Sequence, residues 1–286
     1  MDGFIEDLET LDARQLAIAI RKLADCLTYG TDRSPFLGSG IEYAQSRPYQ
    51  PGDPVRIIDW RVTARTARYW VKDYESPKSM PCYLFVDTSA SMTVSSTAQS
   101  KYHTALYLAG GIALACLDRV SPVGVIGVGE RSLRVAPSMA KHRILQWLLT
   151  LRRYRFDEGT SLTARLREIT PSLTHRVLMV VLSDLHDPGA IASLKHVAQL
   201  HDCVVLQLLD PAEVTLKGSG FLRAREAETG REFVAFGRQR WGDMDRAARE
   251  LRQSGIDHVV IRTDRPYVHA VRDLFRSRGF LMRGAR

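Results

Sequence analysis

Residues 83–92 read YLFVDTSASM, an apolar run that ends in an aspartate followed by two serines at alternate positions. Tyrosine, phenylalanine and valine are typical of a buried strand, and the polar residues follow where that strand would end. Three interpretations of Asp87, Ser89 and Ser91 are open: a turn at the strand end, a nucleophile, or a metal site that binds another protein. The rest of the chain decides between them.

From residue 81 onward, apolar strand patterns alternate with helical patterns. We expect strands at 81–87, 122–128, 131–137, 175–184, 203–210 and 257–262, and helices at 101–117, 140–151, 161–170, 189–200, 241–253 and 267–278. The short Gly129-Glu130 link predicts an antiparallel hairpin between the second and third strands. Continuous apolar strands separated by helices indicate an α/β fold with a doubly wound, mostly parallel sheet covered on both faces.

The first 80 residues have a different character. Apolar residues recur at helical spacing over 4–29, which predicts one or two amphipathic helices. Residues 30–80 are rich in Gly, Pro and Ser and predict loops and short strands, with an edge strand at 68–76. We therefore expect an accessory segment at 1–80 and an α/β domain at 81–286, with an inserted hairpin at 213–237.

The overall composition indicates a globular protein with a basic balance. The 286 residues are 45% hydrophobic and 25% charged, with a net charge of +8. This charge is compatible with an acidic partner or a nucleic acid, but solvated helix faces explain the many arginines more simply. The four cysteines lie far apart and predict no disulfide framework or zinc site: Cys26, Cys82, Cys116 and Cys203.

The same composition predicts a cytoplasmic protein without a transmembrane segment. The first 15 residues are acidic and lack the apolar core of a signal peptide. The longest apolar candidate, at 107–117, is about half the length of a spanning helix. The chain also has no G-x-x-x-x-G-K-[ST] motif for binding ATP.

Polar residues collect where the predicted parallel strands end. Asp87 follows one strand, Asp184 ends another, and Thr160 lies in the GTS stretch that opens a helix. Ligands of doubly wound sheets bind outside the carboxyl ends of the strands, so these side chains are expected to meet. Hydroxyl and carboxylate oxygens suit Mg²⁺ or Mn²⁺. The predicted metal ligands are Asp87, Ser89, Ser91, Thr160 and Asp184.

Charged neighbours of these residues have simpler interpretations. Asp157 and Glu158 precede Thr160 and either tune the charge of the site or form a solvated acidic loop, which we favour. His186 follows Asp184 closely enough to reach the predicted metal, but a loop histidine near a helix start is more often a surface residue, which we favour.

This set of residues resembles the metal-ion-dependent adhesion site of von Willebrand factor A domains. The resemblance rests on D-T-S-A-S at 87–91, Thr160 and Asp184, and it covers about residues 81–265. It implies a doubly wound, Rossmann-like α/β fold with a divalent ion at the carboxyl-end edge of the sheet. It also implies that a carboxylate of a bound partner completes the coordination.

Residues 40–65 resemble the signature of bacterial DUF58 proteins, in which such a segment precedes an A-type domain. The matching residues are Glu42, Arg47, Tyr49, Pro51, Gly52, Asp53, Arg56, Ile58, Trp60, Ala64 and Arg65. The resemblance implies a MoxR-type AAA+ ATPase as partner, in a chaperone-like or complex-maturation role.

The signature segment interleaves arginines with aromatic residues around the turn Gln50-Pro51-Gly52-Asp53. Such a segment is able to fasten itself by ion pairs and cation–π contacts, to dock a protein, or to stack on nucleobases. We favour fastening first and protein docking second, and we do not expect nucleic acid as a partner. The candidates for either role are Arg47, Tyr49, Asp53, Arg56, Trp60 and Arg65.

The pattern favours a non-catalytic, metal-dependent protein-interaction module over two alternatives. A metal-dependent phosphohydrolase with Asp87 as nucleophile generally needs an acid two residues later, where this chain has Ser89. A basic nucleic-acid-binding protein is the other alternative, and it predicts steep salt dependence of binding. We therefore expect no enzyme activity.

Overall fold

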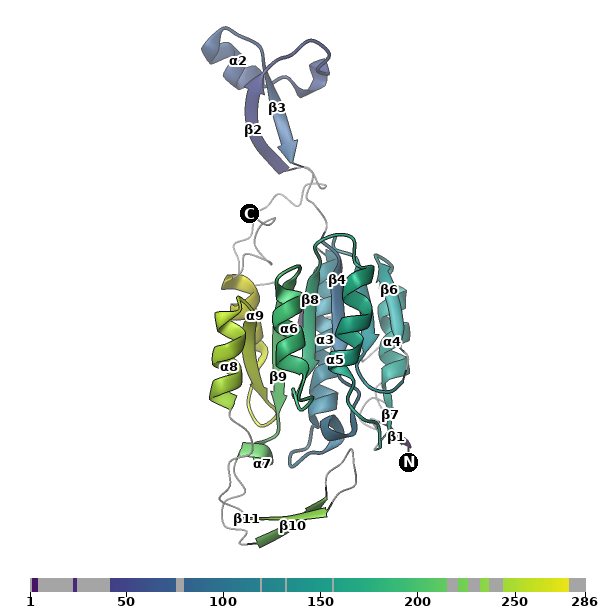
Figure 1. Cartoon of the computed structure of the whole chain (residues 1–286). Helices are drawn as coiled ribbons and strands as arrows, with labels where there is room; N and C mark the ends of the chain where they lie inside the picture. The colour runs from purple at the N-terminus through teal and green to yellow at the C-terminus, as the bar shows by residue number, and fades with distance from the viewer. Residues whose placement is uncertain are drawn as a thin grey trace. The chain divides into compact units, whose positions relative to one another are not determined.

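The computed structural model describes residues 2–4, 23–24, 42–75, 80–118, 120–131, 133–155, 157–214, 221–225, 232–236 and 244–277. The chain divides into two compact units (Figure 1). Among the described residues, one unit comprises 42–75. The other comprises 2–4, 23–24 and those from 80 to 277.

A six-stranded sheet forms the centre of the larger unit, in the order β12-β9-β8-β4-β5-β6. Its strands are β4 (Cys82–Val86), β5 (Val123–Gly127), β6 (Arg134–Ser138), β8 (Leu178–Ser183), β9 (Asp202–Leu209) and β12 (Asp257–Arg262). β6 pairs antiparallel with β5, as the short link predicts, and the other pairs are parallel. The predicted α/β class with a mostly parallel, helix-flanked sheet is confirmed, and the arrangement is compatible with a Rossmann-like fold.

Helices cover both faces of this sheet. They are α3 (Lys101–Asp118), α4 (Lys141–Leu151), α5 (Leu162–Ile169), α6 (Ala190–Ala198), α8 (Met244–Gln253) and α9 (Val268–Ser277). One core cluster joins the sheet to α3, α4 and α9 through residues such as Leu106, Trp147 and Phe275. A second joins it to α5, α6 and α8 through Leu166, Leu194 and others.

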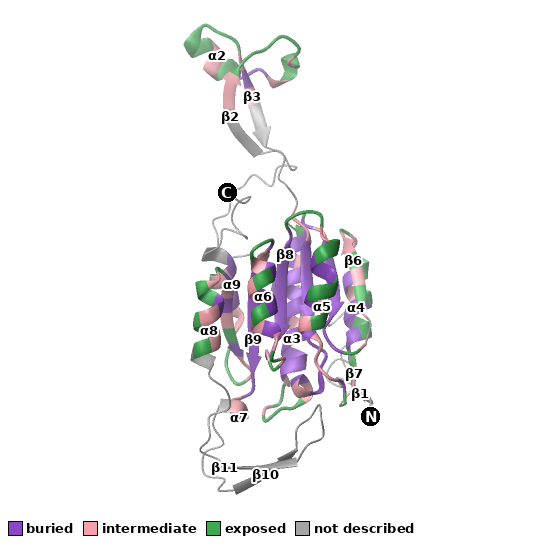
Figure 2. Ribbon diagram, in the orientation of Figure 1, coloured by how far each residue is buried: buried purple, intermediate pink, exposed green. Residues whose placement is uncertain are grey.

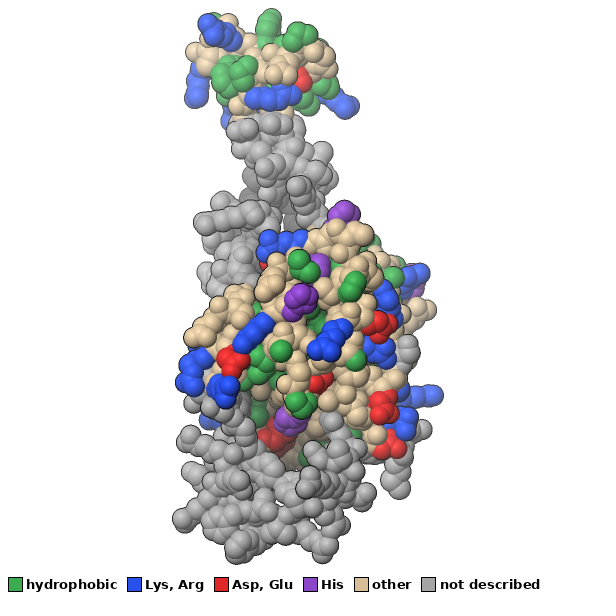
Figure 3. Space-filling view, viewed as in Figure 1, with side chains coloured by type: hydrophobic (Ala, Val, Ile, Leu, Met, Phe, Trp, Pro, Cys, Tyr) green, Lys and Arg blue, Asp and Glu red, His purple; other side chains and the backbone are tan. Residues whose placement is uncertain are grey.

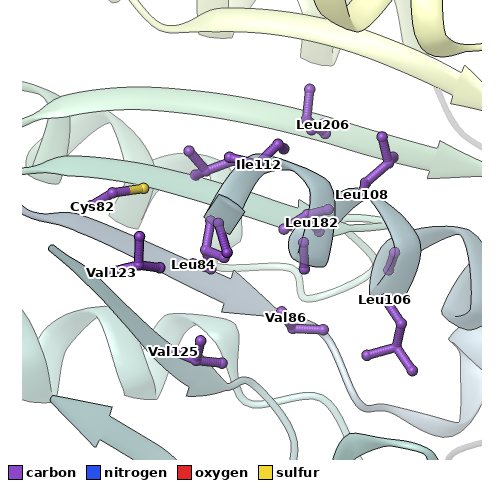
Figure 4. Close-up of a cluster of buried hydrophobic side chains, with 14 of the residues drawn as sticks. Cys82, Leu84, Val86, Leu106, Leu108, Ile112, Val123, Val125, Leu182 and Leu206 are labelled. Carbon is purple, nitrogen blue, oxygen red and sulfur yellow. The ribbon is translucent and has the colours of Figure 1, made fainter. Parts of the chain in front are cut away.

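β4 shows how the sequence produces these two layers. Leu84 and Val86 belong to the first cluster and Phe85 to the second, because successive side chains of a strand point to opposite faces. Figure 4 shows Leu84 and Val86 among the side chains of neighbouring strands and of α3. All three are fully buried (Figure 2), and burial of each contributes about 1.5–3 kcal/mol.

β4 is also where the strand order reverses. From β4 the chain moves outward to β5 and β6 on one side, then returns to β8, β9 and β12 on the other. The carboxyl end of β4, which Asp87 follows, is therefore the switch point at which doubly wound sheets bind ligands.

Shorter elements accompany the sheet. β1 (Asp2–Phe4) pairs antiparallel with β7 (Arg153–Arg155), a pairing that we did not predict. β10 (Phe221–Arg225) and β11 (Glu232–Phe236) pair antiparallel, and the 3-10 helix η4 (Thr170–Ser172) follows α5. Of the predicted helix at 4–29, only Leu23 and Ala24 lie among the described residues at helical positions, and both belong to the first core cluster.

The smaller unit is built on an antiparallel pair, β2 (Glu42–Pro48) with β3 (Trp70–Glu75). Between them lie the predicted turn at 50–53, the 3-10 helix η2 (Val55–Ile57) and the helix α2 (Trp60–Thr66). We expected loops and short strands here, so α2 corrects that prediction. Its N-cap is Asp59, whose side chain accepts hydrogen bonds from the backbone of Arg61 and Val62.

Candidate metal centre

Two carboxylates meet at the switch point because the strands that precede them are adjacent and parallel. Val86 of β4 pairs with Leu182 of β8, and the Asp87 amide donates to the Leu182 carbonyl at 2.9 Å. Asp184 directly follows β8. Both side chains are buried, so the protein holds two acidic groups close together, away from water.

A chain of hydrogen bonds connects four of the five predicted ligands. The Asp87 Oδ1 atom accepts from the Ser89 amide at 3.0 Å, and the Ser89 and Ser91 hydroxyls lie 3.0 Å apart. Ser91 Oγ donates to Asp184 Oδ2 at 2.8 Å. The short 3-10 helix η3 (Ala90–Thr93) curls the chain here, and Ser91 contacts the second carboxylate while Ser89 contacts Ser91.

Thr160, the fifth predicted ligand, reaches the same edge through the backbone of its own loop. It forms a bridge with Gly129, directly after β5 and Val128, and its side chain is half-buried. Two residues earlier, the Glu158 carbonyl accepts from the Ala90 amide at 2.7 Å. The loop of Thr160 is thus bound directly to the loop of the two serines.

Glu158 corrects the prediction of a solvated acidic loop. Its carboxylate is fully buried and accepts from Thr88 Oγ1 at 2.8 Å, from the Arg131 amide at 3.0 Å and from Arg131 Nε at 2.7 Å. A Cβ atom on Gly129 would lie 2.0 Å from Glu158 Oε1, so only glycine fits there. Glu158 therefore joins its own loop to the loop of Thr88 and to that of Arg131. Asp157 is exposed, as expected.

Lys101 and Glu213 also belong to this edge, and sequence reasoning missed both. Lys101, the first residue of α3, has no exposed surface, and its Nζ atom donates to Asp184 Oδ2 at 2.8 Å. The same ammonium makes a second, closer contact with Glu213 Oε1, on the short helix α7 (Pro211–Val214). A lysine that opens an otherwise apolar helix was the available signal.

Burial and charge separate the two aspartates. Burial, together with the nearby Asp184 charge, raises the pKa of Asp87 to about 7. Burial also acts to raise the pKa of Asp184, but Lys101, His186 and the hydrogen bond from Ser91 outweigh it and leave that pKa lowered. Burial acts to lower the pKa of Lys101, and the charges of Asp184 and Glu213 reverse the effect and raise it.

The donor set fits a hard divalent cation. Asp87, Ser89, Ser91 and Asp184 offer carboxylate and hydroxyl oxygens, the ligands that Mg²⁺ and Mn²⁺ prefer. His186 is exposed, as expected, but its Nδ1 atom lies 3.2 Å from Asp184 Oδ2. One ligand atom each from Asp184, His186 and Glu213 lie within 4.8 Å of one another, a spacing that also allows a shared cation.

The predicted signature residues lie in the smaller unit, where ion pairing fastens the turn. Arg47 donates to both carboxylate oxygens of Asp53 at 2.7 and 2.8 Å, and this hydrogen bonding lowers the pKa of Asp53. The Tyr49 ring packs edge-on against Tyr69.

Three further signature residues of this unit face solvent. Trp60 is 62% exposed, and Arg56 and Arg65 are exposed as well. Figure 3 shows hydrophobic and basic side chains at the surface of this unit.

The comparisons with known proteins identify a family and uncharacterized relatives. The family described as "Protein of unknown function DUF58" matches residues 45–253. Uncharacterized proteins of Mycobacterium tuberculosis and Mycobacterium bovis are 26% identical over 281 residues, which cover 93% of this chain and 89% of each relative. The uncharacterized protein YeaD of Bacillus subtilis is 29% identical over 94 residues, 32% of this chain and 24% of YeaD.

A solved structure, titled an uncharacterized membrane spanning protein from Vibrio fischeri, is also similar. It is 14% identical, covers 70% of this chain and 98% of its own, and has a TM-score of 0.21. Its title names a membrane spanning protein, and the predicted cytoplasmic location is withdrawn. The prediction relied on the lack of an apolar spanning segment, which does not test whether a protein works at a membrane. Within the described ranges, no helix is long and apolar enough to cross a bilayer.

Proposed function

We propose a function for this chain from the premise that it belongs to the DUF58 family, whose function is unknown. The chain is a non-catalytic interaction module that binds a protein partner through a divalent cation at the carboxyl-end edge of its sheet. The observation that carries the proposal is the hydrogen-bonded series Asp87, Ser89, Ser91, Asp184 at the switch point of the sheet.

The residues of this edge have distinct tasks in the proposal. Asp87, Ser89, Ser91 and Asp184, together with Thr160, would hold the cation, and the resemblance to adhesion sites of von Willebrand factor A domains supports that assignment. Bound Mg²⁺ or Mn²⁺ would offer a coordination position to a carboxylate of the partner. Glu158 holds the loops of Ser89 and Thr160 together, so that the oxygens are arranged before binding.

The local chemistry favours binding over catalysis. A phosphohydrolase that uses Asp87 as nucleophile generally needs an acid two residues later, and that position holds Ser89, whose hydroxyl contacts Ser91. The Asp87 carboxylate itself accepts hydrogen bonds from the Ser89 amide and the Ser183 hydroxyl. These contacts hold the carboxylate in place and reduce its nucleophilicity.

A MoxR-type AAA+ ATPase is the partner that we propose, in a chaperone-like or complex-maturation role. This part of the proposal is supported by the family resemblance of the signature segment. The partner is expected to present an exposed aspartate or glutamate to the metal edge.

The proposal is tested by removing one ligand and measuring metal binding directly. We expect Asp87→Ala to lose at least about 100-fold in Mg²⁺ affinity by titration calorimetry at pH 8, where the wild-type carboxylate is ionised. Asp157→Ala is the matched control, because it removes an exposed carboxylate from the loop of Thr160.

The same variants are then used in affinity capture with Mg²⁺ and with EDTA. We expect wild type and Asp157→Ala to capture the ATPase only with Mg²⁺, and Asp87→Ala not to capture it. Equal capture by wild type and Asp87→Ala, with and without EDTA, would contradict the proposal.

A further inference from the structure

Lys101 places a positive charge at the predicted metal site. Its ammonium is fully buried at the start of α3 and contacts two carboxylates, Asp184 and Glu213. A buried ammonium is unfavourable unless it is paired, so this arrangement is strongly determined by its partners.

The ammonium shares an oxygen atom with the predicted ligand set. Asp184 Oδ2 accepts from Ser91 Oγ at 2.8 Å and from Lys101 Nζ at 2.8 Å. A divalent cation bound by Asp184 and the serine would therefore lie close to the ammonium. Two cations at such a distance, away from water, repel each other strongly.

The charges of the edge show what the ammonium does without a metal. Asp87, Asp184 and Glu213 contribute three carboxylates, and Lys101 balances one of them. A second cation would complete the neutralisation, but only against the repulsion of the first. The affinity of the edge for a divalent ion thus depends on how firmly a group other than Asp184 binds the Lys101 ammonium.

Glu213 provides that other binding position. Its second oxygen, Oε2, accepts from the Asp210 amide at 3.1 Å, which fixes the carboxylate at the end of β9. The Asp210 side chain in turn accepts from the Ser96 amide at 2.8 Å, in the segment before α3. Glu213 is therefore held in place independently of Asp184.

We propose that Lys101 is a built-in counter-cation that competes with the divalent ion for Asp184, and that Glu213 moderates this competition by holding the ammonium. Lys101 and Glu213 act as positioning residues in this scheme, and Asp184 Oδ2 is the contested atom. The inference rests on the proposed function, because it concerns the affinity of the same site.

Charge-removing variants test the competition. Lys101→Gln keeps a hydrogen-bond donor without the charge, and we expect it to bind Mg²⁺ about tenfold or more tightly than wild type by calorimetry at pH 8. Lys195→Gln is the matched control, because it neutralises a lysine paired with Glu250 on the helical layer, and its affinity should equal that of wild type. Unchanged or weaker Mg²⁺ binding by Lys101→Gln would overturn the proposal.

Glu213 is tested in both backgrounds. If Glu213 acts by holding the ammonium, Glu213→Gln weakens Mg²⁺ binding several-fold in wild type and has no effect in Lys101→Gln. An equal loss in both backgrounds makes Glu213 a metal ligand with Asp184 and His186, and overturns its role through Lys101. Circular dichroism with EDTA checks that each variant folds. If Lys101→Gln does not fold, the single variant Glu213→Gln is the test. Mg²⁺ binding by Glu213→Gln that equals or exceeds that of wild type then overturns the proposal.

The failure of the inference is distinguishable from the failure of the proposed function. Identical Mg²⁺ titrations for wild type and Asp87→Ala contradict the proposed function whatever Lys101 does. If Lys101→Gln binds Mg²⁺ and wild type does not, the competition is supported. In that case the Lys101 ammonium occupies the wild-type edge in place of a metal ion.

Discussion

The two units of this protein carry charge in opposite ways. At the carboxyl-end edge of the sheet, Asp87, Asp184, Glu158 and Lys101 are buried, and each has defined partners at hydrogen-bond distance. In the unit at 42–75, the exposed charged side chains among those that the structure describes are Arg56, Arg61, Arg65 and Arg68. Buried charges determine the geometry around them, because losing one partner leaves the other unpaired in a low-dielectric interior. Exposed charges impose no such requirement on the fold. Any role they have is therefore in contacts with other molecules.

The largest effect is expected from breaking a buried pair at the edge. Lys101→Met leaves Asp184 without its buried counter-charge, and we expect the metal-free protein to lose about 3–5 kcal/mol of unfolding free energy. Urea denaturation in EDTA measures this loss, and added Mg²⁺ should recover part of it. A loss below about 1 kcal/mol would show that the edge tolerates an unpaired carboxylate.

The next effect concerns the space around Glu158. Gly129→Ala places a Cβ atom 2.0 Å from Glu158 Oε1 and 2.2 Å from Thr88 Oγ1. The buried hydrogen bond from Thr88 to Glu158 must therefore break or shift. We expect a loss of about 2–3 kcal/mol and weaker Mg²⁺ binding.

Gly159→Ala is the control for Gly129→Ala. Its Cβ atom would meet only Glu130 Oε1, at 3.2 Å, and the Glu130 side chain is exposed and able to move. Equal unfolding free energies of the two variants would contradict the bracing role of Glu158.

The candidate site also shows which features could be predicted from the sequence. Apolar runs predict β4 and β8, and parallel neighbours bring Asp87 and Asp184 together at one edge, so the hydrogen-bonded ligand series follows from local patterns. Lys101 and Glu213 meet across 112 positions of sequence, and no local pattern contains their pairing.

The helix α2 was missed for a different reason. Its seven residues, WRVTART, include β-branched side chains and show no buried face. Its ends are fixed by an N-cap at Asp59 and a left-handed residue, Ala67. Such a helix is predicted from the residues that cap it, and the N-cap residue Asp59 was the available signal.

Among the described side chains of the smaller unit, Asp59 is a charged group that is buried and hydrogen-bonded. It accepts from Ser46 Oγ at 2.7 Å and from the Arg61 and Val62 amides. We expect Asp59→Ala to weaken α2 by about 1–2 kcal/mol, seen as faster hydrogen exchange of its amides. The control, Asp53→Asn, should affect the turn at 50–53 and leave exchange in α2 unchanged. Unaltered α2 exchange in Asp59→Ala would show that the cap is dispensable.

A pH effect follows from a buried histidine of the sheet. Burial, with a smaller contribution from Arg252, lowers the pKa of His258 from 6.5 to about 4. Its ring stays neutral in the fold while the unfolded chain takes up a proton near pH 6.5. The contribution of this histidine to stability is therefore complete above pH 6.5 and is lost as the pH falls towards 4.

We expect this histidine to contribute about 1–2 kcal/mol to the pH dependence. Urea denaturation from pH 4 to 7 should give a flatter profile for His258→Gln than for wild type. His142→Gln, on exposed α4 surface, should keep the wild-type profile. An unchanged slope in His258→Gln would place the pH dependence elsewhere.

The smallest effect on stability is expected from the exposed arginines. Arg61→Gln and Arg65→Gln should change unfolding free energy and α2 exchange by less than about 0.5 kcal/mol, because both side chains are in water. Arg47→Gln is the contrasting variant, since it breaks the bidentate pair with Asp53 and should loosen the turn. If Arg61→Gln and Arg65→Gln weaken partner capture while stability and Mg²⁺ titration stay unchanged, the exposed arginines contribute to docking. If capture is also unchanged, Arg61 and Arg65 are solvated surface residues that take no part in docking.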